Sequence, residues 1–194
     1  MSKFTKITFV AGALAVFASG FAYTSQDTQA MEANGYKTIV DDKGTIVMPE
    51  VDFRKDWTAL GTWAIAADEG TQGSKGFHVV YTQPETVAAY RKTGKFPDGA
   101  VLVKELFSTT THSRPTGVVS QADSLTGAFV MVKDTKNRFP GNKLWGDGWG
   151  WAFFDAKDSK MTPTKDYKEE CLGCHVPAKD TDWIYIGGYP VLKK

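Results

Sequence analysis

The sequence predicts a mostly β domain of the α+β kind, in which an antiparallel sheet is accompanied by a few short helices. Stretches rich in aromatic and β-branched residues recur along the chain, and clusters of Gly, Ser, Pro and Asp separate them. The chain also holds 19 glycines, which disfavour a bundle of long helices because each glycine weakens a helix interior. Both observations indicate strands joined by turns.

The first predicted elements are a β-hairpin and a helix. WTALGTWAIAA (57–67) and GFHVVYT (76–82) are strand-like and flank the glycine-rich EGTQGSKG, which is typical of two antiparallel strands joined by a loop. Pro84 then precedes a run of good helix formers that stops at Gly94. Because proline is favoured in the first turn of a helix and glycine just after its end, we expect a helix over 85–93.

Five more stretches have the composition of strands. Four of them follow the helix and are separated by polar or glycine-containing turns: AVLVKELFSTTT (100–111), TGVVSQA (116–122), SLTGAFVMVKD (124–134) and GWGWAFFDAK (148–157). The run WIYIGGYPVL (183–192) is predicted to be the last strand. No internal repeat, low-complexity tract or linker divides these elements, so we expect a single domain.

Residues 1–30 have the layout of a secretory signal peptide. Two lysines precede an apolar stretch at 7–23, and small or polar residues follow as far as Ala30. An uncleaved membrane anchor is the alternative, since the apolar stretch is close to the shortest bilayer span, roughly 17 residues. We expect cleavage, after Ala30 or else after Ala22, and export of the single domain 31–194 to the periplasm.

The remaining chain carries no marked charge. Residues 31–194 contain as many basic as acidic residues and no basic stripe, which gives no reason to expect nucleic acid as a partner. Charged residues or glycines interrupt every other apolar run before it reaches the length of a membrane span. We therefore expect no membrane association once the signal peptide has been removed.

Cys171, Cys174 and His175 form a Cys-x-x-Cys-His motif near the C-terminus. In an oxidising compartment the default for two cysteines is a disulfide. A structural zinc site needs four ligands, and the other two histidines, His78 and His112, are far away in sequence. A thioredoxin-like pair would follow a strand that opens a βαβ unit, and none is predicted there. Haem c attachment uses two thiols and an adjacent His, so the motif favours one covalent haem c with His175 as axial ligand.

The residues around this motif are predicted to form a short helix. Thr162 or Thr164 is a candidate N-cap, acidic residues follow in the next turns, and Pro177 is expected to end the helix. Residues three and four apart are neighbours on a helix surface, which would bring both thiols and the imidazole together.

The ligand on the other side of the iron is not evident from the sequence. An electron-transfer cytochrome uses Met or His there, and the candidates are His78, His112 and the methionines at positions 31, 48, 131 and 161. Met131 lies in an apolar strand, where core packing is its expected role, and His112 lies in a polar loop. The sequence therefore does not require six-coordinate iron.

Four segments carry a resemblance to a known family. QPETVAAYRKTGKF (83–96), FPDGAVLVKELFS (96–108), VMVKDTKNRF (130–139) and CLGCHVPAKDTDWIYIGGYPVL (171–192) resemble, in order and spacing, the cytochrome P-460 family. That resemblance implies a bacterial periplasmic mono-haem c protein associated with hydroxylamine oxidation, an antiparallel β fold, usually a homodimer, and five-coordinate resting iron. It also implies that Lys104, in the V-K-E-L segment, forms a covalent bond to the haem macrocycle.

The place of Lys104 in its predicted strand follows from alternation alone. Lys104 shares one face with Leu102 and Leu106, while Glu105 lies on the other face. A lysine among leucines either extends to the rim of the sheet or is desolvated. Desolvation favours the neutral, nucleophilic amine that a bond to haem would require. Together with the resemblance, this makes the cross-link our expectation.

Phe129 departs from the pattern of the hydroxylamine-oxidising family members, which carry a distal carboxylate three residues before the valine of V-K-D. Phenylalanine cannot accept a proton, so general-base help in deprotonating hydroxylamine would be missing, a loss of about 10²- to 10⁴-fold in rate. A distal phenylalanine also resembles cytochrome c′-beta, a related group that binds nitric oxide and carbon monoxide under an aromatic cap. We therefore expect weak hydroxylamine oxidoreductase activity.

Aromatic residues concentrate shortly before the Cys-x-x-Cys-His motif, at Trp145, Trp149, Trp151 and Phe153. From residue 149 onward they occupy alternating positions, which places them on one face of a strand. They would suit the wall of a haem pocket, the core of the domain or a dimer interface, and the sequence does not separate these roles.

Two main classes of function follow from these residues. As an enzyme, the protein would oxidise hydroxylamine, with or without nitric oxide as co-substrate, and pass electrons to a small acceptor cytochrome. As a binding protein, it would capture nitric oxide or another diatomic gas without turnover. A plain electron carrier with six-coordinate iron is a third alternative.

Overall fold

The structure, a computed structural model, describes residues 36–193, so the predicted signal peptide at 1–30 lies outside the described residues. Six strands form one sheet in the order β1-β2-β3-β4-β6-β5, and every neighbouring pair is antiparallel. The mostly β, antiparallel fold predicted from the sequence is confirmed. The strands are β1 (Thr58–Ala66), β2 (Ser74–Thr82), β3 (Val101–Arg114), β4 (Gly117–Lys133), β5 (Trp145–Gly146) and β6 (Trp149–Asp155).

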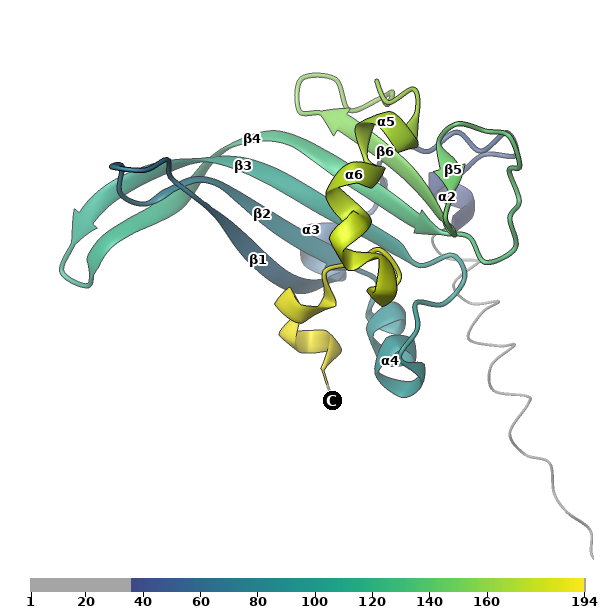
Figure 1. The fold of residues 1–194 in the computed structure, drawn as a ribbon, viewed down its shortest axis with the longest axis horizontal. Helices are drawn as coiled ribbons and strands as arrows, with labels where there is room; N and C mark the ends of the chain where they lie inside the picture. The colour runs from purple at the N-terminus through teal and green to yellow at the C-terminus, as the bar shows by residue number, and fades with distance from the viewer. Residues whose placement is uncertain (1–35, 194) are drawn as a thin grey trace, which may run out of the picture.

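Two hairpins make most of the sheet. The predicted hairpin of β1 and β2 is confirmed, and β3 and β4 form a longer one whose far end projects from the body (Figure 1). The prediction of separate strands at 116–122 and 124–134 is wrong, because both belong to β4. The polar residues Asp123 and Ser124 coincide with a register shift against β3, so they bulge the strand without turning the chain.

Short helices cover both faces of the sheet (Figure 1). The predicted helix at 85–93 is confirmed as α4, with Gly94 left-handed at its end. No helix among residues 36–193 is long and apolar enough to cross a membrane. The helices are α2 (Lys37–Ile39), α3 (Phe53–Asp56), α4 (Pro84–Thr93), α5 (Tyr167–Glu170) and α6 (Leu172–His175), followed by the 3₁₀ helices η2 (Val176–Thr181), η3 (Ile186–Gly188) and η4 (Pro190–Leu192).

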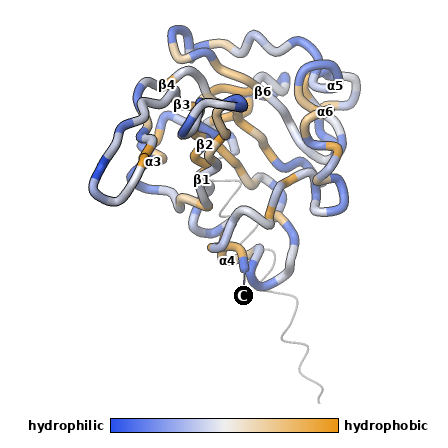
Figure 2. Tube along the Cα trace, turned by 60° about the vertical axis from the view of Figure 1, so that its left-hand side comes forward, coloured by the Kyte–Doolittle hydropathy of each residue, from blue (hydrophilic) through white to orange (hydrophobic). Residues whose placement is uncertain are grey.

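The alternation of side chains divides the buried residues into two cores. Leu102, Met131 and Trp151 pack on one face of the sheet, the cavity face, which the C-terminal segment 167–192 covers. The other face, the back face, holds a second core that includes Val130 and the residues around α2 and α3. Figure 2 shows hydrophobic residues along the strands and hydrophilic ones in the outer loops. Two cores on one sheet are the expected result of strands buried on both sides.

An ion pair between the half-exposed Arg54 and the buried Glu105 fixes α3 on the back face. Glu105 is 1% exposed, and the guanidinium of Arg54 donates to both of its carboxylate oxygens, with Arg54 Nε 3.1 Å from Oε2. An unpaired carboxylate at this depth would cost several kcal/mol. Since Glu105 faces the back core, its neighbour Lys104 faces the cavity side, as the alternation predicted.

The predicted last strand at 183–192 is wrong. The chain forms η3 and η4 there, closed by local bonds such as Tyr189 N–H to the Ile186 carbonyl at 3.0 Å. Pro190 cannot donate to a ladder, and Gly187 with Gly188 permits a tight turn. The segment instead crosses β1 closely, since a Cβ added at Gly61 would lie 2.6 Å from the Gly188 carbonyl oxygen.

Candidate functional site

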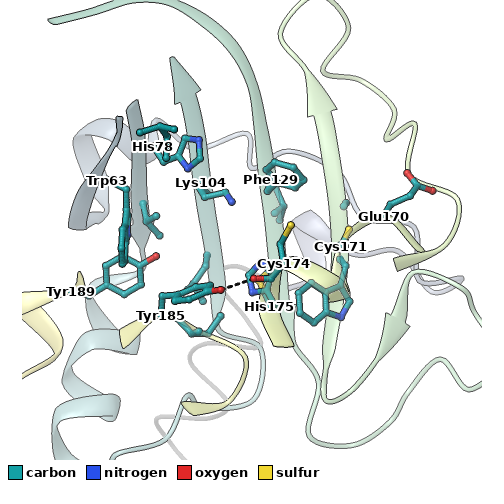
Figure 3. A pocket seen from close by; sticks show the side chains of 18 residues that line it. Trp63, His78, Lys104, Phe129, Glu170, Cys171, Cys174, His175, Tyr185 and Tyr189 are labelled. Carbon is teal, nitrogen blue, oxygen red and sulfur yellow. Dashed lines mark hydrogen bonds between the residues drawn. The ribbon is translucent and has the colours of Figure 1, made fainter. Parts of the chain in front are cut away.

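A cavity of about 400 Å³ lies between the cavity face of the sheet and the C-terminal segment (Figure 3). Its sheet wall comes from β1 to β4 and β6, and includes His78, Lys104 and Phe129. Its C-terminal wall comes from the segment between Glu170 and Tyr189, and includes Cys171, Cys174, His175 and Tyr185. All five site residues predicted from the sequence therefore line one cavity, of a size typical of small-molecule and cofactor pockets.

The segment before the two cysteines is tied to the edge of the sheet. Thr162 and Thr164, the predicted N-caps, are not caps: their hydroxyls bond the backbone of Phe153 at 2.7 and 3.0 Å. Asp166 caps α5 instead, accepting from Lys168 N–H at 3.0 Å. The N-cap prediction was wrong because both threonine hydroxyls bond the backbone of β6, a partner that the residues next to them in the sequence do not reveal.

The predicted single helix around the motif is two short helices. The first, α5, ends at Glu170, Cys171 leaves the helical conformation with φ of −123°, and α6 runs to His175. Pro177 does not end the helical path but lies inside η2. Cys171 is buried and Cys174 exposed, and the two thiols are not joined. Burial, with the nearby Glu170 carboxylate, raises the pKa of the Cys171 thiol to about 11.

The imidazole of His175 is held in one orientation. Its Nδ1 lies 2.6 Å from the carbonyl oxygen of Trp183, and because a carbonyl can only accept, Nδ1 carries the proton and Nε2 has a free lone pair. Burial lowers the pKa of His175 by more than this hydrogen bond raises it, so the ring is neutral at neutral pH. The edge of Trp151 packs at 5.0 Å between ring centroids. A neutral, oriented imidazole is what metal ligation requires.

Lys104 points from β3 into the cavity (Figure 3). Its Nζ lies 4.6 Å from the ring centroid of Phe129, and within residues 36–193 it makes no hydrogen bond or ion pair. Burial lowers the pKa of Lys104, an effect only partly offset by the two cysteine sulfurs. A desolvated amine without a counter-ion has a larger neutral fraction, which is the nucleophilic form.

Phe129 is the residue directly opposite Lys104 in the β3–β4 register. Its ring lines the cavity and packs against Phe153 at 4.9 Å between centroids. The sheet wall therefore has an aromatic surface at position 129, where the resemblance implies a carboxylate in the hydroxylamine-oxidising family members. Apolar surface here excludes water and disfavours polar ligands.

Two of the candidates for the sixth iron ligand, His78 and Met131, also line the cavity. Burial, and secondarily the charge of Lys104, lowers the pKa of His78, so the imidazole is neutral at neutral pH. Met31 lies outside the described residues. The remaining candidates lie elsewhere: His112 is exposed on the projecting β3–β4 hairpin, and Met48 packs against the back core. Met161 is 74% exposed.

Residues 51–186 match a protein-family model that is described as Cytochrome P460. The chain belongs to the cytochrome P460 family. The match covers all six strands and the complete Cys-x-x-Cys-His motif, and membership implies a haem c cofactor. A comparison with curated proteins gave no match.

The residues of this cavity fit a haem c. The cavity is largely apolar, as the macrocycle requires, and both thiols and the free Nε2 of His175 belong to one wall (Figure 3). Cys171, Cys174 and His175 would hold the group. Within residues 36–193, no group of three or more His, Cys, Asp or Glu side chains is arranged to hold a metal ion by itself.

The aromatic run around residues 145–153 divides between the two faces of the sheet. Trp151 lines the cavity and stacks near Tyr167 at 5.8 Å between centroids. Trp149 is fully buried on the same face, while Trp145 belongs to the back core, where its Nε1 donates to the Gly44 carbonyl. A haem-wall role therefore fits Trp151, and a core role fits the other two tryptophans.

Several cavity residues escaped prediction. Trp63 on β1 and Tyr185 and Tyr189 after the motif close the outer side, with Trp63 packed edge-on against both tyrosines. The Tyr185 hydroxyl donates to the Cys174 carbonyl at 2.6 Å (Figure 3). The only sequence signal for the tyrosines was their position soon after His175, which the erroneous strand prediction obscured.

Proposed function

We propose that this protein is an exported mono-haem c protein with five-coordinate iron that carries out slow redox chemistry on hydroxylamine and nitric oxide. The observation that supports this most directly is that Lys104 shares one cavity with Cys171, Cys174 and His175. Membership of the family implies the haem c cofactor. The desolvated Lys104 is the feature that favours chemistry like that of the hydroxylamine-oxidising members.

The chain's own residues have separable roles in this proposal. Cys171 and Cys174 would hold the haem c through thioether bonds, and His175 would bind its iron through Nε2. Lys104 would bond to the macrocycle. That bond replaces one N–H and one C–H by N–C, so two electrons and two protons must leave, and a peroxide that is reduced to water would accept them. The haem supplies the redox centre.

Phe129 is the reason why we expect slow turnover of hydroxylamine. With phenylalanine beside Lys104, the distal side lacks a carboxylate to take a proton from hydroxylamine, which lowers turnover by about 10²- to 10⁴-fold relative to a site with such a base. The electrons of oxidation would pass to a small acceptor cytochrome, and the protons to solvent. Phe129 would also keep bulk water away from the reacting ligand.

The second candidate function is capture of nitric oxide or another diatomic gas without turnover. The aromatic surface of Phe129, packed on Phe153, favours it, because a small apolar ligand loses little on leaving water. In that case Lys104 would remain a free amine. A plain electron carrier, with His78 or Met131 bound to iron, would instead have a six-coordinate low-spin resting spectrum.

The assay that tests the proposal is hydroxylamine-dependent reduction of an added electron acceptor, for the natural protein and for Phe129→Glu. We expect slow reduction by the natural protein and a rise of about 10²-fold or more in the variant. A silent natural protein with an active variant would leave gas capture as the natural function. Silence of both would contradict the assignment of Phe129 to the distal side.

We also propose the periplasm as the location and a homodimer as the assembly. Support comes from the signal-like residues 1–30 and from the family's usual assembly. The N-terminal sequence of the purified protein and its mass in solution test both. An N-terminus at Met1, or a monomer at all concentrations, would contradict them.

A further inference from the structure

The turn that carries the hydrogen-bond partner of His175 has an unusual backbone. Asp182 and Trp183 both have positive φ, +60° and +65°, a region that non-glycine residues seldom adopt and that is an outlier for a bulky side chain. Such conformations persist only where the surroundings hold them. The Trp183 carbonyl that accepts from His175 Nδ1 belongs to this turn. Whatever holds the turn therefore also places the axial imidazole.

Two residues from the end of the sheet hold the turn. Lys133, the last residue of β4, places Nζ 2.7 Å from Asp182 Oδ1. Trp149, the first residue of β6, donates from Nε1 to the Asp182 backbone carbonyl at 3.0 Å, and Nε1 also lies 3.3 Å from Oδ1. Both the backbone and the side chain of Asp182 are thus fixed from the sheet.

This arrangement is packed, unlike an exposed ion pair. The Lys133 side chain is 9% exposed, and its Nζ lies 4.8 Å from the ring centroid of Trp149, its neighbour in the β4–β6 register. Gly148 leaves room for the amine, since a Cβ there would lie only 3.1 Å from Nζ. A cation held between a ring face and a carboxylate in low exposure interacts more strongly than a solvated pair.

We propose that Lys133 and Asp182 are positioning residues for the axial histidine and thereby tune the haem. The ion pair keeps the Trp183 carbonyl in line with His175 Nδ1, and that hydrogen bond makes the imidazole a stronger donor to iron. A stronger donor stabilises the oxidised iron and weakens the bond to a ligand on the opposite side. This inference rests on haem attachment at His175, part of the proposed function, and not on which ligand is bound.

Lys133→Met is the variant that breaks the clamp while keeping side-chain length. Without the cation, the Asp182–Trp183 turn can relax toward a common backbone conformation, and the hydrogen bond to His175 Nδ1 lengthens. We expect the iron–histidine stretching band of the ferrous protein, measured by resonance Raman spectroscopy, to move to lower frequency. The reduction potential should rise in parallel, because the weaker donor stabilises oxidised iron less.

Two further variants separate positioning from general anchoring. Lys143→Met is the matched control, because Lys143 also pairs with an aspartate, Asp166 at 3.2 Å, which directly precedes the C-terminal segment, but has no link to the Trp183 carbonyl. Asp182→Asn keeps the side-chain size and decides the question if Lys133→Met fails to fold. We expect a shifted band in Asp182→Asn and a natural band in Lys143→Met.

The outcomes divide cleanly. A lower band in Lys133→Met or Asp182→Asn, with Lys143→Met unchanged, supports the inference. A natural band and potential in both clamp variants, even with lower thermal stability, would overturn it and leave the ion pair as an anchor only. A natural protein that carries haem but lacks any iron–histidine band would instead count against His175 as the axial ligand.

Discussion

The two walls of the cavity are built in different ways. The C-terminal wall draws Cys171, Cys174 and His175 from one short segment of local turns, held by side-chain bonds to backbone. The sheet wall draws His78, Lys104 and Phe129 from three strands far apart in sequence, aligned by cross-strand register. The C-terminal wall is suited to hold a haem, and the sheet wall is suited to determine the reactivity of that haem.

This difference means that attachment and reactivity can vary separately. The C-terminal wall depends on a fixed spacing, so a change to its three attachment residues should abolish binding. Lys104 and Phe129 each stand on a strand whose backbone pairing does not depend on the side chain, so exchanging them leaves the sheet intact.

The largest effect is expected from removing the attachment thiols. The double variant Cys171→Ala with Cys174→Ala, made in the Lys104→Met background so that the proposed lysine bond cannot hold the haem, should lose covalent haem completely, because no other cysteine is present in the sequence. Haem that stays with the protein after acid–acetone extraction is the measurement. The control is Lys104→Met, which changes the opposite wall and should keep covalent haem through the two thioethers. Haem retained by the double variant would contradict the assignment.

A second variant weakens the contact between the walls. Trp151→Ala removes a side chain that is 1% exposed and touches Tyr167 and His175, so unfolding should cost about 3–5 kcal/mol less. Chemical denaturation measures this loss. Trp63→Ala at the outer edge is the matched control, and because Trp63 is 37% exposed its effect should be smaller. Equal losses would contradict a structural role for Trp151 at the wall contact.

A smaller, pH-dependent effect is expected at Asp98, which touches neither wall. Burial alone would raise the pKa of Asp98, but hydrogen bonds from Arg138 and Thr135 outweigh it and lower the pKa from 3.8 to about 2. The lowered value stabilises the folded state by about 2 kcal/mol above pH 4, and this contribution disappears as the pH falls toward 2.

Asp98→Asn tests this directly. The variant should be less stable than the natural protein near neutral pH and should lack its loss of stability between about pH 4 and 2, as followed by the free energy of unfolding. Its covalent haem content should be unchanged, because Asp98 contributes to neither wall of the cavity. An identical pH dependence in both proteins would show that Asp98 is not the titrating group.

The features that could be predicted from the sequence are those that depend on neighbouring residues. The attachment motif was evident because its residues are neighbours in the chain, and the face of Lys104 was evident because strand alternation is local. The hairpin β1–β2 and helix α4 were marked by glycine and proline at their boundaries. These features need no knowledge of distant partners.

The errors came from partners that lie far apart in sequence. The segment 183–192 has the composition of a strand, but Gly187, Gly188 and Pro190 fold it into turns packed on β1. The Asp182–Trp183 turn, with its positive φ values, gave no signal, since the side chains that bond it from the sheet belong to Lys133, about fifty residues earlier, and to Trp149. Local propensity does not record contacts of this kind.

The most direct test of the central claim is the ferrous optical spectrum of the purified natural protein beside that of Lys104→Ala. We expect absorption well to the red of an ordinary c-type cytochrome in the natural protein, and a return to the ordinary c-type position in the variant, with haem content equal in both. An ordinary c-type spectrum in the natural protein, or identical spectra in the two proteins, would contradict a sheet wall that modifies the haem through Lys104.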